Sequence, residues 1–561
     1  MLVFLFLFAI AYAQDNLSVN TTQGVVIGSR ASDGNYYSFY GIHYAGSTAG
    51  QNRFKAPTPA PVYPGDYHAI DTKIICAQPT SRGLVGVEDC LVLNVFTPNA
   101  TTKDRPVLVW LESEQYTTTR QKLYSVKKLV EEDLVVVSMN YRLSIFGFLC
   151  LGVPDAPGNA GLKDVIQGLQ WIKNNIAGFG GNPNNVVLLG HSSGAAIAEL
   201  ITLSPLSQGL VHKVIAISGS ALSPWAVAYE PIKYAESLGE KLQYVGKSRA
   251  QLAAAFASTD INVLAPVLND FEFFNNTPLF APCIEDRNLN INDSVLTDAP
   301  INLLRNGNYS HVPYIAAFVD KEGTIRAEQA AFRNWLNKMQ NNFTDFVQVD
   351  LKFESAQNKS AVAQSIREYY FAQRAINMET IEDFLDYQGD TMILVSVIRG
   401  IAERAATSRS PVRLLEFAFR GTHHSDWAYP QIPVTGAKHG AMLNYLFDFD
   451  LRSGDYPVQN SLLKRFSAFA RNGDPNPANT AVVWNPYTAA STITLRLSGE
   501  DTISSSHSFQ EEVRVNVHQQ RMGFWNNIFA IHYTPPQASS AARIISLTLV
   551  LISCVLALKL L

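Results

Sequence analysis

The sequence predicts an α/β fold built on a large, mostly parallel sheet that helices cover on both faces. Two runs, residues 106–111 and 134–139, are apolar at nearly every position. Strands with this pattern are buried on both faces, as in a parallel sheet between two helix layers. Between residues 162 and 176, apolar residues recur at the spacing of one helix face. Strand-like and helix-like segments therefore alternate, which is typical of a doubly wound sheet.

An antiparallel meander is expected ahead of that sheet. Residues 24–28 and 37–42 are rich in β-branched and aromatic side chains, and turn-forming residues lie between them. Residues 88–96 continue as a further strand. These segments predict an antiparallel edge on the N-terminal side of the parallel strands.

The second half of the chain alternates strands with longer helical segments. No repeat or low-complexity linker interrupts it, so we expect one large domain over residues 14–530, followed by a linker at 531–543. The strand-like segments are residues 214–218, 314–319 and 412–417, and the helical ones are 321–341 and 355–385.

One short stretch in the middle of the chain carries a catalytic pattern. The run 186–189 ends at Gly190, and His191-Ser192-Ser193-Gly194 then leads into an alanine-rich helical segment. A G-x-S-x-G turn between a strand and a helix holds its serine at strained backbone angles, with the hydroxyl clear of the sheet edge. Glycine is needed at both ends because a Cβ there would collide with the neighbouring strand or helix. Ser192 is therefore the candidate nucleophile.

Composition limits the class of protein. The 561 residues are 47% hydrophobic and 16% charged, which allows a large core and excludes a disordered chain. The net charge is −4 and no run of Lys or Arg occurs, so we expect no nucleic-acid partner.

Both ends of the chain carry apolar segments. Residues 1–13 end in a small-x-small pattern and are expected to be a signal peptide. Residues 544–561 are apolar at most positions and follow a run of small residues, which predicts a GPI signal or a short membrane-spanning segment. A buried core helix is the alternative for this tail. We expect a secreted or cell-surface protein that the tail attaches to a membrane.

Cysteines and glycosylation sequons agree with secretion. Cys76 and Cys90 bracket a short polar loop and are the natural disulfide pair, which would contribute ~3 kcal/mol. Cys150 lies in an apolar run and is expected to be a buried free thiol. Sequons occur at Asn16, Asn20, Asn99, Asn275, Asn292, Asn308, Asn342 and Asn358.

A nucleophilic serine needs a base within hydrogen-bond reach and a carboxylate that orients the base. Glu322 follows the strand-like segment 314–319 and precedes a glycine, while His439 lies in a loop between two glycines. Both residues come after the serine in the order acid, then histidine, which suits this chemistry. A solvated carboxylate and a structural loop histidine are the alternatives, and the residues alone leave them open.

A set of motifs resembles the type-B carboxylesterase/cholinesterase family over nearly all of residues 20–530. The resemblance implies an α/β-hydrolase fold, a disulfide between Cys76 and Cys90, and a triad of Ser192 as nucleophile, His439 as base and acid, and Glu322 as the orienting acid. Ser218 matches a family serine that supports the acid. The motifs are FYGIHYA (39–45), RF (53–54), EDCLVLN (88–94), NYR (140–142), GNAGLKD (158–164), GFGGNP (178–183), SGS (218–220), FARNGDPN (469–476) and FW (524–525).

The oxyanion loop departs from the family. Where the family has His-Gly-Gly-Gly, this chain has Glu112-Ser113-Glu114-Gln115, followed by Tyr116. The corresponding oxyanion donors are the amides of Glu114, Gln115 and Ser193, but glycine is what lets the backbone approach the substrate closely. Glu114 also brings a carboxylate near a developing negative charge. We therefore expect reduced turnover, since losing one donor costs ~10²–10³ in rate.

Substrate and cofactor expectations follow by exclusion. The loop between Cys76 and Cys90 has no tryptophan, so it lacks the aromatic face that holds a quaternary ammonium in cholinesterases. We expect small uncharged esters as substrates and no cofactor. The pair His423-His424 does not predict a metal site, because adjacent histidines seldom face one ion.

Two functions remain. The complete set Ser192, Glu322 and His439 favours a carboxylic-ester hydrolase, which we prefer. The altered oxyanion loop favours a catalytically inactive adhesion or binding ectodomain with an extracellular protein partner, as in the neuroligin-like and glutactin-like branches of the family.

Overall fold

The computed structural model describes residues 15–80, 83–119, 124–289, 293–424, 428–500 and 509–538. The expected signal peptide at 1–13, the tail at 544–561 and the sequon at Asn292 lie outside these residues.

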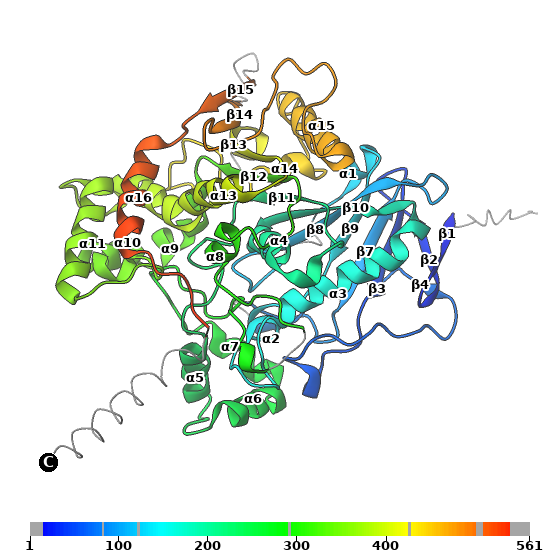
Figure 1. Cartoon of the computed structure of the whole chain (residues 1–561), viewed down its shortest axis with the longest axis horizontal. Helices are drawn as coiled ribbons and strands as arrows, with labels where there is room; N and C mark the ends of the chain where they lie inside the picture. Colours follow the sequence, from blue (N-terminus) through cyan, green and yellow to red (C-terminus); the bar gives the residue numbers. More distant parts are fainter. Residues whose placement is uncertain are drawn as a thin grey trace, which may run out of the picture.

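A single mixed sheet runs through the molecule (Figure 1). Among the described residues it has 13 strands in the order β1-β2-β3-β7-β9-β8-β10-β11-β12-β13-β14-β15, and β4 pairs with β2 outside this path. The strands are β1 (Asn16–Thr21), β2 (Gly24–Arg30), β3 (Tyr37–His43), β4 (Tyr67–His68), β7 (Val92–Thr97), β8 (Arg105–Ser113), β9 (Val135–Met139), β10 (Gly181–Ser192), β11 (Lys213–Ile217), β12 (Tyr314–Val319), β13 (Val412–Arg420), β14 (Ile493–Glu500) and β15 (Gln510–Val515), while β5 (Gln78–Thr80) and β6 (Gly83–Val85) form a separate ribbon.

The centre of the sheet is parallel and its two ends are antiparallel. Neighbouring strands from β9 through β8 and β10 to β14 all pair in parallel. Strands β1, β2, β3 and β7 pair antiparallel, and so do β14 and β15. The predicted α/β fold with an N-terminal meander is therefore confirmed.

Helices cover both faces of the sheet, as the doubly apolar strands require. In β8, Val107, Val109 and Leu111 pack into one core cluster, whereas Leu108 and Trp110 pack into a second cluster on the other face. The helices are α1 (Lys127–Glu131), α2 (Ser144–Phe148), α3 (Ala160–Asn175), α4 (Ser193–Leu203), α5 (Pro231–Lys241), α6 (Arg249–Ser258), α7 (Ile261–Leu268), α8 (Pro300–Arg305), α9 (Ala327–Phe332), α10 (Trp335–Asn341), α11 (Ala356–Phe371), α12 (Ile381–Gly389), α13 (Val395–Thr407), α14 (Leu443–Leu446), α15 (Tyr456–Asn472) and α16 (Gln519–His532).

The long helices expected at 321–341 and 355–385 are each broken. The first divides into a 3₁₀ turn at Glu322–Arg326 followed by α9 and α10, and Asn334 before α10 has a φ of 58°. The second divides at Ala372, whose φ is 50°. An apolar repeat continues across such left-handed residues, so the pattern alone did not show the breaks. The pieces instead pack with α16 around a third apolar cluster beside the sheet (Figure 1).

Strand order reverses at β8, and this fixes the place of the site. Strand β8 has β9 on one side and β10 on the other, and all three are parallel. Ligands of open α/β sheets bind beyond the carboxyl ends of the strands at such a reversal. The register pairs Glu112 with His191 and Ser113 with Ser192. The residue that follows β8, Glu114, therefore emerges beside Ser192.

Two disulfides are present in the described chain. Cys76 and Cys90 are bonded, as the resemblance implies. The expectation of a free thiol at Cys150 was wrong, because Cys150 is bonded to Cys283. The apolar run around Cys150 indicated burial correctly, and the residue is 2% exposed. Its partner lies 133 positions along the chain, a distance that only the tertiary fold closes.

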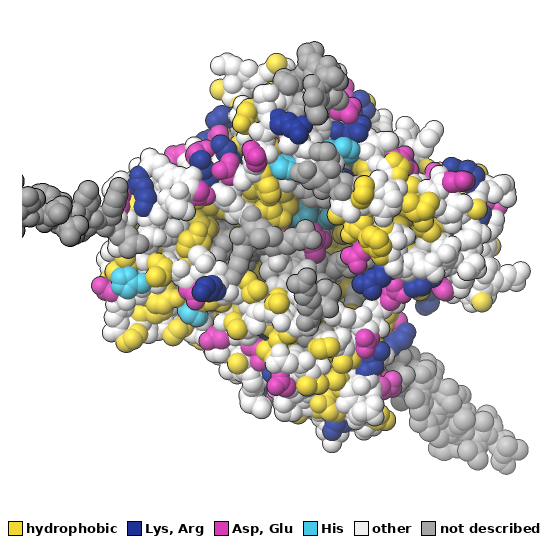
Figure 2. All heavy atoms as spheres, turned by 180° about the vertical axis from the view of Figure 1, so that it is seen from behind, with side chains coloured by type: hydrophobic (Ala, Val, Ile, Leu, Met, Phe, Trp, Pro, Cys, Tyr) yellow, Lys and Arg dark blue, Asp and Glu magenta, His cyan; other side chains and the backbone are white. Residues whose placement is uncertain are grey.

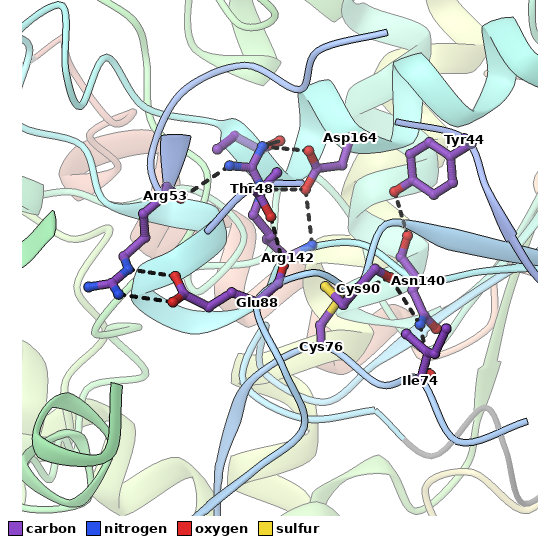
Figure 3. Close-up of a disulfide and its surroundings, with 11 residues drawn as sticks. Tyr44, Thr48, Arg53, Ile74, Cys76, Glu88, Cys90, Asn140, Arg142 and Asp164 are labelled. Carbon is purple, nitrogen blue, oxygen red and sulfur yellow. Dashed lines mark hydrogen bonds and ion pairs between the residues drawn. A yellow bond between two sulfur atoms is a disulfide. The ribbon is translucent and has the colours of Figure 1, made fainter. Parts of the chain in front are cut away.

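Two ion pairs lie beside the Cys76–Cys90 bridge (Figure 3). Arg53 donates to both carboxylate oxygens of Glu88, at 2.6 and 2.9 Å. Arg142 donates to both oxygens of Asp164, at 2.7 and 2.5 Å, and both of these side chains are at most 3% exposed. Paired donors and acceptors of this geometry are strong because two parallel hydrogen bonds join opposite charges.

No single helix of the described chain has both the length and the apolar character to cross a bilayer; one strongly bent pair, α6 with α7, passes by length and composition.

We expect Asp164→Ala to lower the free energy of unfolding by ~3–5 kcal/mol, because it leaves the buried guanidinium of Arg142 without its carboxylate. Urea denaturation followed by fluorescence measures this change. Asp155→Ala is the matched control, since Asp155 is 60% exposed and pairs with Lys55 at the surface. That variant should lose no more than ~1 kcal/mol. Equal effects of the two substitutions would contradict the prediction.

Candidate active site

Ser192 occupies the sharp turn between β10 and α4. Its φ is 56°, a value that a non-glycine residue rarely adopts, and it directly precedes the first turn of α4. A Cβ on Gly194 would lie 2.2 Å from the carbonyl oxygen of Leu111, and one on Gly190 would lie 2.3 Å from that of Gly194. Both glycines are therefore required by close backbone approach, as expected for this turn.

His439 and Glu322 meet although 117 positions separate them. His439 Nδ1 lies 2.5 Å from Glu322 Oε2, and the two side chains are 7% and 2% exposed. The loops that carry them are joined by a backbone bridge between Lys321 and Lys438. Glu322 also accepts a hydrogen bond from the amide of Val319 at 2.9 Å, at the end of β12. These contacts fix the carboxylate and the imidazole in one orientation.

The side chain of Glu114 lies between Ser192 and His439. The hydroxyl of Ser192 donates to Glu114 Oε2 at 3.1 Å. Glu114 Oε1 lies 3.6 Å from His439 Nε2 and 3.7 Å from His191 Nδ1. Among the described residues, His439 Nε2 has no hydrogen-bond partner. The structure thus places His439 against Glu322 on one side and, through the carboxylate of Glu114, next to Ser192 on the other.

The backbone of the altered oxyanion segment forms a tight hairpin turn. Gln115 and Tyr116 have φ values of 52° and 61°, as the two central residues of a type I′ turn do. The carbonyl oxygen of Glu114 accepts from the amide of Thr117 at 2.9 Å, and the amide of Glu114 donates to Thr118 at 2.8 Å. Of the three amides expected to donate to an oxyanion, the amide of Glu114 is therefore already hydrogen-bonded within the turn.

The side chain of Ser193 holds this turn in place. Its hydroxyl accepts from the amide of Tyr116 at 3.0 Å and donates to the carbonyl oxygen of Ser113 at 2.6 Å. The hydroxyl of Tyr141 in turn donates to Ser113 Oγ at 2.8 Å. The sequence assigned Ser193 only a backbone role, and its hydroxyl was missed. The available signal was that Ser113, whose Oγ lies 2.6 Å from that of Ser193, stands where the family loop has a glycine.

Ser218 lies close to the site but is not joined to Glu322. It is fully buried at the end of β11 with a φ of 57°. Its hydroxyl has no hydrogen-bond partner among the described residues.

Two opposing effects set the electrostatics of His439. Burial by itself lowers the pKa of this imidazole, but the charges of Glu114 and Glu322 outweigh burial and hold the pKa well above its ordinary value. A raised pKa favours the imidazolium, the form of the ring that cannot accept a proton from Ser192. The pKa of Glu114 is affected in the opposite sense: burial raises it, but the charges of His439 and His191 lower it below the usual range.

A large cavity adjoins the hairpin turn. It has a volume of about 930 Å³, and Gln115, Tyr116, Thr117 and Thr118 form part of its wall. Aromatic side chains line much of the rest, namely Trp225, Phe271, Phe273, Phe280 and Trp335.

One group of side chains at the site has the donor atoms for a metal ion. The ligand atoms of Glu114, His191 and His439 all lie within 4.8 Å of one another. Sequence reasoning missed this group, because it treated His191 only as part of the serine turn and Glu114 only as an unfavourable charge.

We expect Glu114→Gln to lower the pKa of His439 by ~1–3 pH units, since one of the two charges that raise it is removed. Titration of the His439 ring by NMR, in protein labelled at histidine, measures the change. Glu131→Gln, at a side chain 51% exposed and remote from the site, is the control and should leave the His439 titration unchanged. An unchanged pKa in Glu114→Gln would show that the contact between Glu114 and His439 does not govern the ring.

Comparison with known proteins agrees with this arrangement. The chain matches the carboxylesterase family over residues 15–525. Venom carboxylesterase-6 of Apis mellifera is 29% identical over 465 residues, which cover 79% of this chain and 83% of that protein. Bile salt-activated lipase of Rattus norvegicus is 28% identical, with 90% and 84% covered, and juvenile hormone esterase of Tribolium castaneum is 26% identical, with 85% and 86% covered. These relatives support carboxylic-ester hydrolysis as the class of activity, and the chain belongs to the carboxylesterase family.

Proposed function

We propose that the protein hydrolyses carboxylic esters through an acyl-enzyme on Ser192, with His439 as general base and acid and Glu322 as the carboxylate that orients it. The contact of 2.5 Å between His439 and Glu322, beside a serine held at a φ of 56°, is the observation that carries the proposal. A triad is recognised by this geometry and not by the positions of its members in the chain.

In the proposed reaction, Ser192 Oγ attacks the ester carbonyl carbon and its proton passes to His439 Nε2. The tetrahedral intermediate then collapses, and His439 returns the proton to the departing alcohol. Water repeats these steps on the acyl-enzyme and releases the acid. Throughout, Glu322 keeps the other ring nitrogen, Nδ1, engaged and stabilises the imidazolium.

Glu114 opposes this reaction in the resting state. It accepts the hydroxyl proton of Ser192 in a hydrogen bond and helps to keep His439 charged. A carboxylate in this position also repels the developing oxyanion, while its own amide is engaged with Thr118. We therefore propose slow turnover that begins only when the side chain of Glu114 leaves its position between Ser192 and His439.

We propose small, uncharged esters as substrates. The cavity beside the hairpin turn reaches Gln115 and is bordered by aromatic side chains, which suit an apolar acyl or alcohol group. Four charged residues of its wall pair with each other, Lys338 with Glu272 at 2.7 Å and Arg333 with Glu328 at 3.4 Å. Of the other two, Asp270 pairs with Lys241 at 3.8 Å and Arg326 donates to the amide oxygen of Asn276 at 3.1 Å.

We also propose that the protein matures in the secretory pathway. Its two disulfides suit an oxidising compartment. Four of the expected glycosylation sites, Asn16, Asn20, Asn308 and Asn342, are exposed, whereas Asn99, Asn275 and Asn358 are partly buried. On the face in Figure 2, basic and acidic side chains are interspersed, which does not favour nucleic acid as a partner.

A second candidate function is a binding ectodomain that has lost turnover. The observation that favours it is the hydrogen bond from Ser192 to Glu114, which leaves the nucleophile bonded to a carboxylate and not to its base.

We expect an organophosphonate to label the purified protein at one site per chain, because attack by Ser192 on phosphorus needs the same activation as attack on an ester. Mass spectrometry of the intact protein measures the stoichiometry. Ser192→Ala is the control and should remain unlabelled. Failure of the wild-type chain to label, or equal labelling of both proteins, would exclude the enzyme and favour the binding function.

We expect Glu114→Ala to raise kcat/KM for a short-chain nitrophenyl ester by ~10²-fold, the scale of one oxyanion-hole contribution. Alanine removes the carboxylate while keeping a residue that suits the negative φ at this position, so the turn should persist. Glu131→Ala is the matched control, with no expected change. A rate as low as that of the wild type, in a variant that still labels at Ser192, would show that the turn and not the carboxylate limits turnover.

A further inference from the structure

We propose that Glu114, His191 and His439 form a binding site for a divalent transition-metal ion of the zinc type. This site does not include the adjacent histidines His423 and His424. It lies next to the hydroxyl of Ser192, which donates to Glu114 Oε2. Two imidazole nitrogens and one carboxylate oxygen form a donor set that suits Zn²⁺, whereas Mg²⁺ and Ca²⁺ prefer oxygen ligands only.

The separations of the donor atoms fit one ion. Zn²⁺ binds nitrogen at ~2.0–2.1 Å and carboxylate oxygen at ~2.0–2.2 Å, so two ligand atoms of a tetrahedral site lie ~3.3 Å apart. Glu114 Oε1 lies 3.6 Å from His439 Nε2 and 3.7 Å from His191 Nδ1. All three donor atoms lie within 4.8 Å of one another. Small side-chain adjustments therefore bring them to coordination distance without a change in the backbone.

The orientation of His439 is a second, independent observation. Its side chain is 93% buried, Nδ1 is held by Glu322 at 2.5 Å, and Nε2 faces Glu114 without a hydrogen-bond partner among the described residues. A metal-binding histidine usually has this arrangement, with a carboxylate on one ring nitrogen and the ion on the other. His439 is therefore a ligand whose other ring nitrogen, Nδ1, is already held by the carboxylate of Glu322.

The surroundings hold the other two ligands nearby. His191 is 2% exposed at the end of β10, and its ring centroid lies 4.8 Å from that of His439. Glu114 is fixed by the hairpin turn at the end of β8, the strand that pairs with β10. The ligands therefore come from two adjacent strand ends and one loop.

The adjacent histidines His423 and His424 lie in a less suitable setting. Arg420 contacts His424 Nε2 at 3.3 Å, and Lys438 Nζ donates to the carbonyl oxygens of both residues. Two basic groups at this point disfavour a cation. The pair therefore provides a control for histidine-dependent binding elsewhere in the chain.

A bound ion would displace the proton of His439 Nε2 into solvent and take the lone pair that the proposed acyl transfer needs, so the metal should inhibit hydrolysis. This consequence rests on the proposed function, whereas the site itself does not. Ser192→Ala cannot form an acyl-enzyme but keeps all three ligands. Binding measured on that variant therefore tests the site whether or not the protein is an esterase.

The experiment is equilibrium dialysis of untagged Ser192→Ala protein against Zn²⁺, with the visible spectrum of the Co²⁺ form as a second readout. We expect one ion per chain and cobalt bands of four-coordinate intensity. Glu322→Gln, which alters the carboxylate that holds His439 Nδ1 but removes no metal ligand, should weaken binding ~10–100-fold. His191→Gln and Glu114→Gln, each added to Ser192→Ala, should weaken it more, with circular dichroism confirming that each variant is folded.

The matched control is His423→Gln with His424→Gln, which should leave both the stoichiometry and the affinity unchanged. Lack of stoichiometric binding would overturn the proposal. Binding that survives both His191→Gln and Glu114→Gln would also overturn it, as would binding that is lost in the control. In the chain with Ser192 intact, Zn²⁺ should slow organophosphonate labelling in proportion to its occupancy.

Discussion

The parallel pairing of β8 with β10 is the constraint on which the rest of the site depends. Because Ser113 and Ser192 are paired across these strands, whatever follows β8 must lie beside the serine. The absence of a Cβ at Gly190 and Gly194 lets the backbone of the serine turn approach the end of β8 closely. In this chain the residue so placed is a glutamate. The glutamate that follows β8 therefore places a negative charge next to the nucleophile, because the strand register fixes the position of its backbone.

The structure shows how the surrounding residues accommodate that change. The segment after β8 becomes a hairpin turn in which Gln115 and Tyr116 adopt positive φ values. The hydroxyl of Ser193 bonds to the amide of Tyr116 and the carbonyl oxygen of Ser113, and the hydroxyl of Ser113, where the family loop has a glycine, accepts from Tyr141. The altered residues thus support one another as a unit. Because these hydrogen bonds hold the turn in one conformation, the altered segment is an ordered part of the site. We propose that it slows turnover, binds a metal ion, or does both.

The three charged or titratable groups at the centre also depend on one another. The charge of Glu114 holds the pKa of His439 high, and the charge of His439 holds the pKa of Glu114 low. A proton on His439 and a metal ion at the same place would each neutralise Glu114. In the proposed function, an ester reaches an active Ser192 only when the carboxylate is displaced from both groups. Under the two proposals, metal binding and ester hydrolysis would therefore compete for the same few atoms.

The sequence by itself determined the central sheet and the candidate nucleophile, because their signals are local. Doubly apolar runs indicated the parallel strands, and the glycines of the G-x-S-x-G turn marked Ser192. The residues alone left the roles of Glu322 and His439 open, and only the resemblance to the family proposed them as triad members. The tertiary structure alone decided which side chains contact one another. It joined Cys150 to Cys283, broke the helices expected at 321–341 and 355–385, and set Glu114 between Ser192 and His439. Contacts between residues far apart in the chain arise from packing and strand register, and neither leaves a local pattern in the sequence.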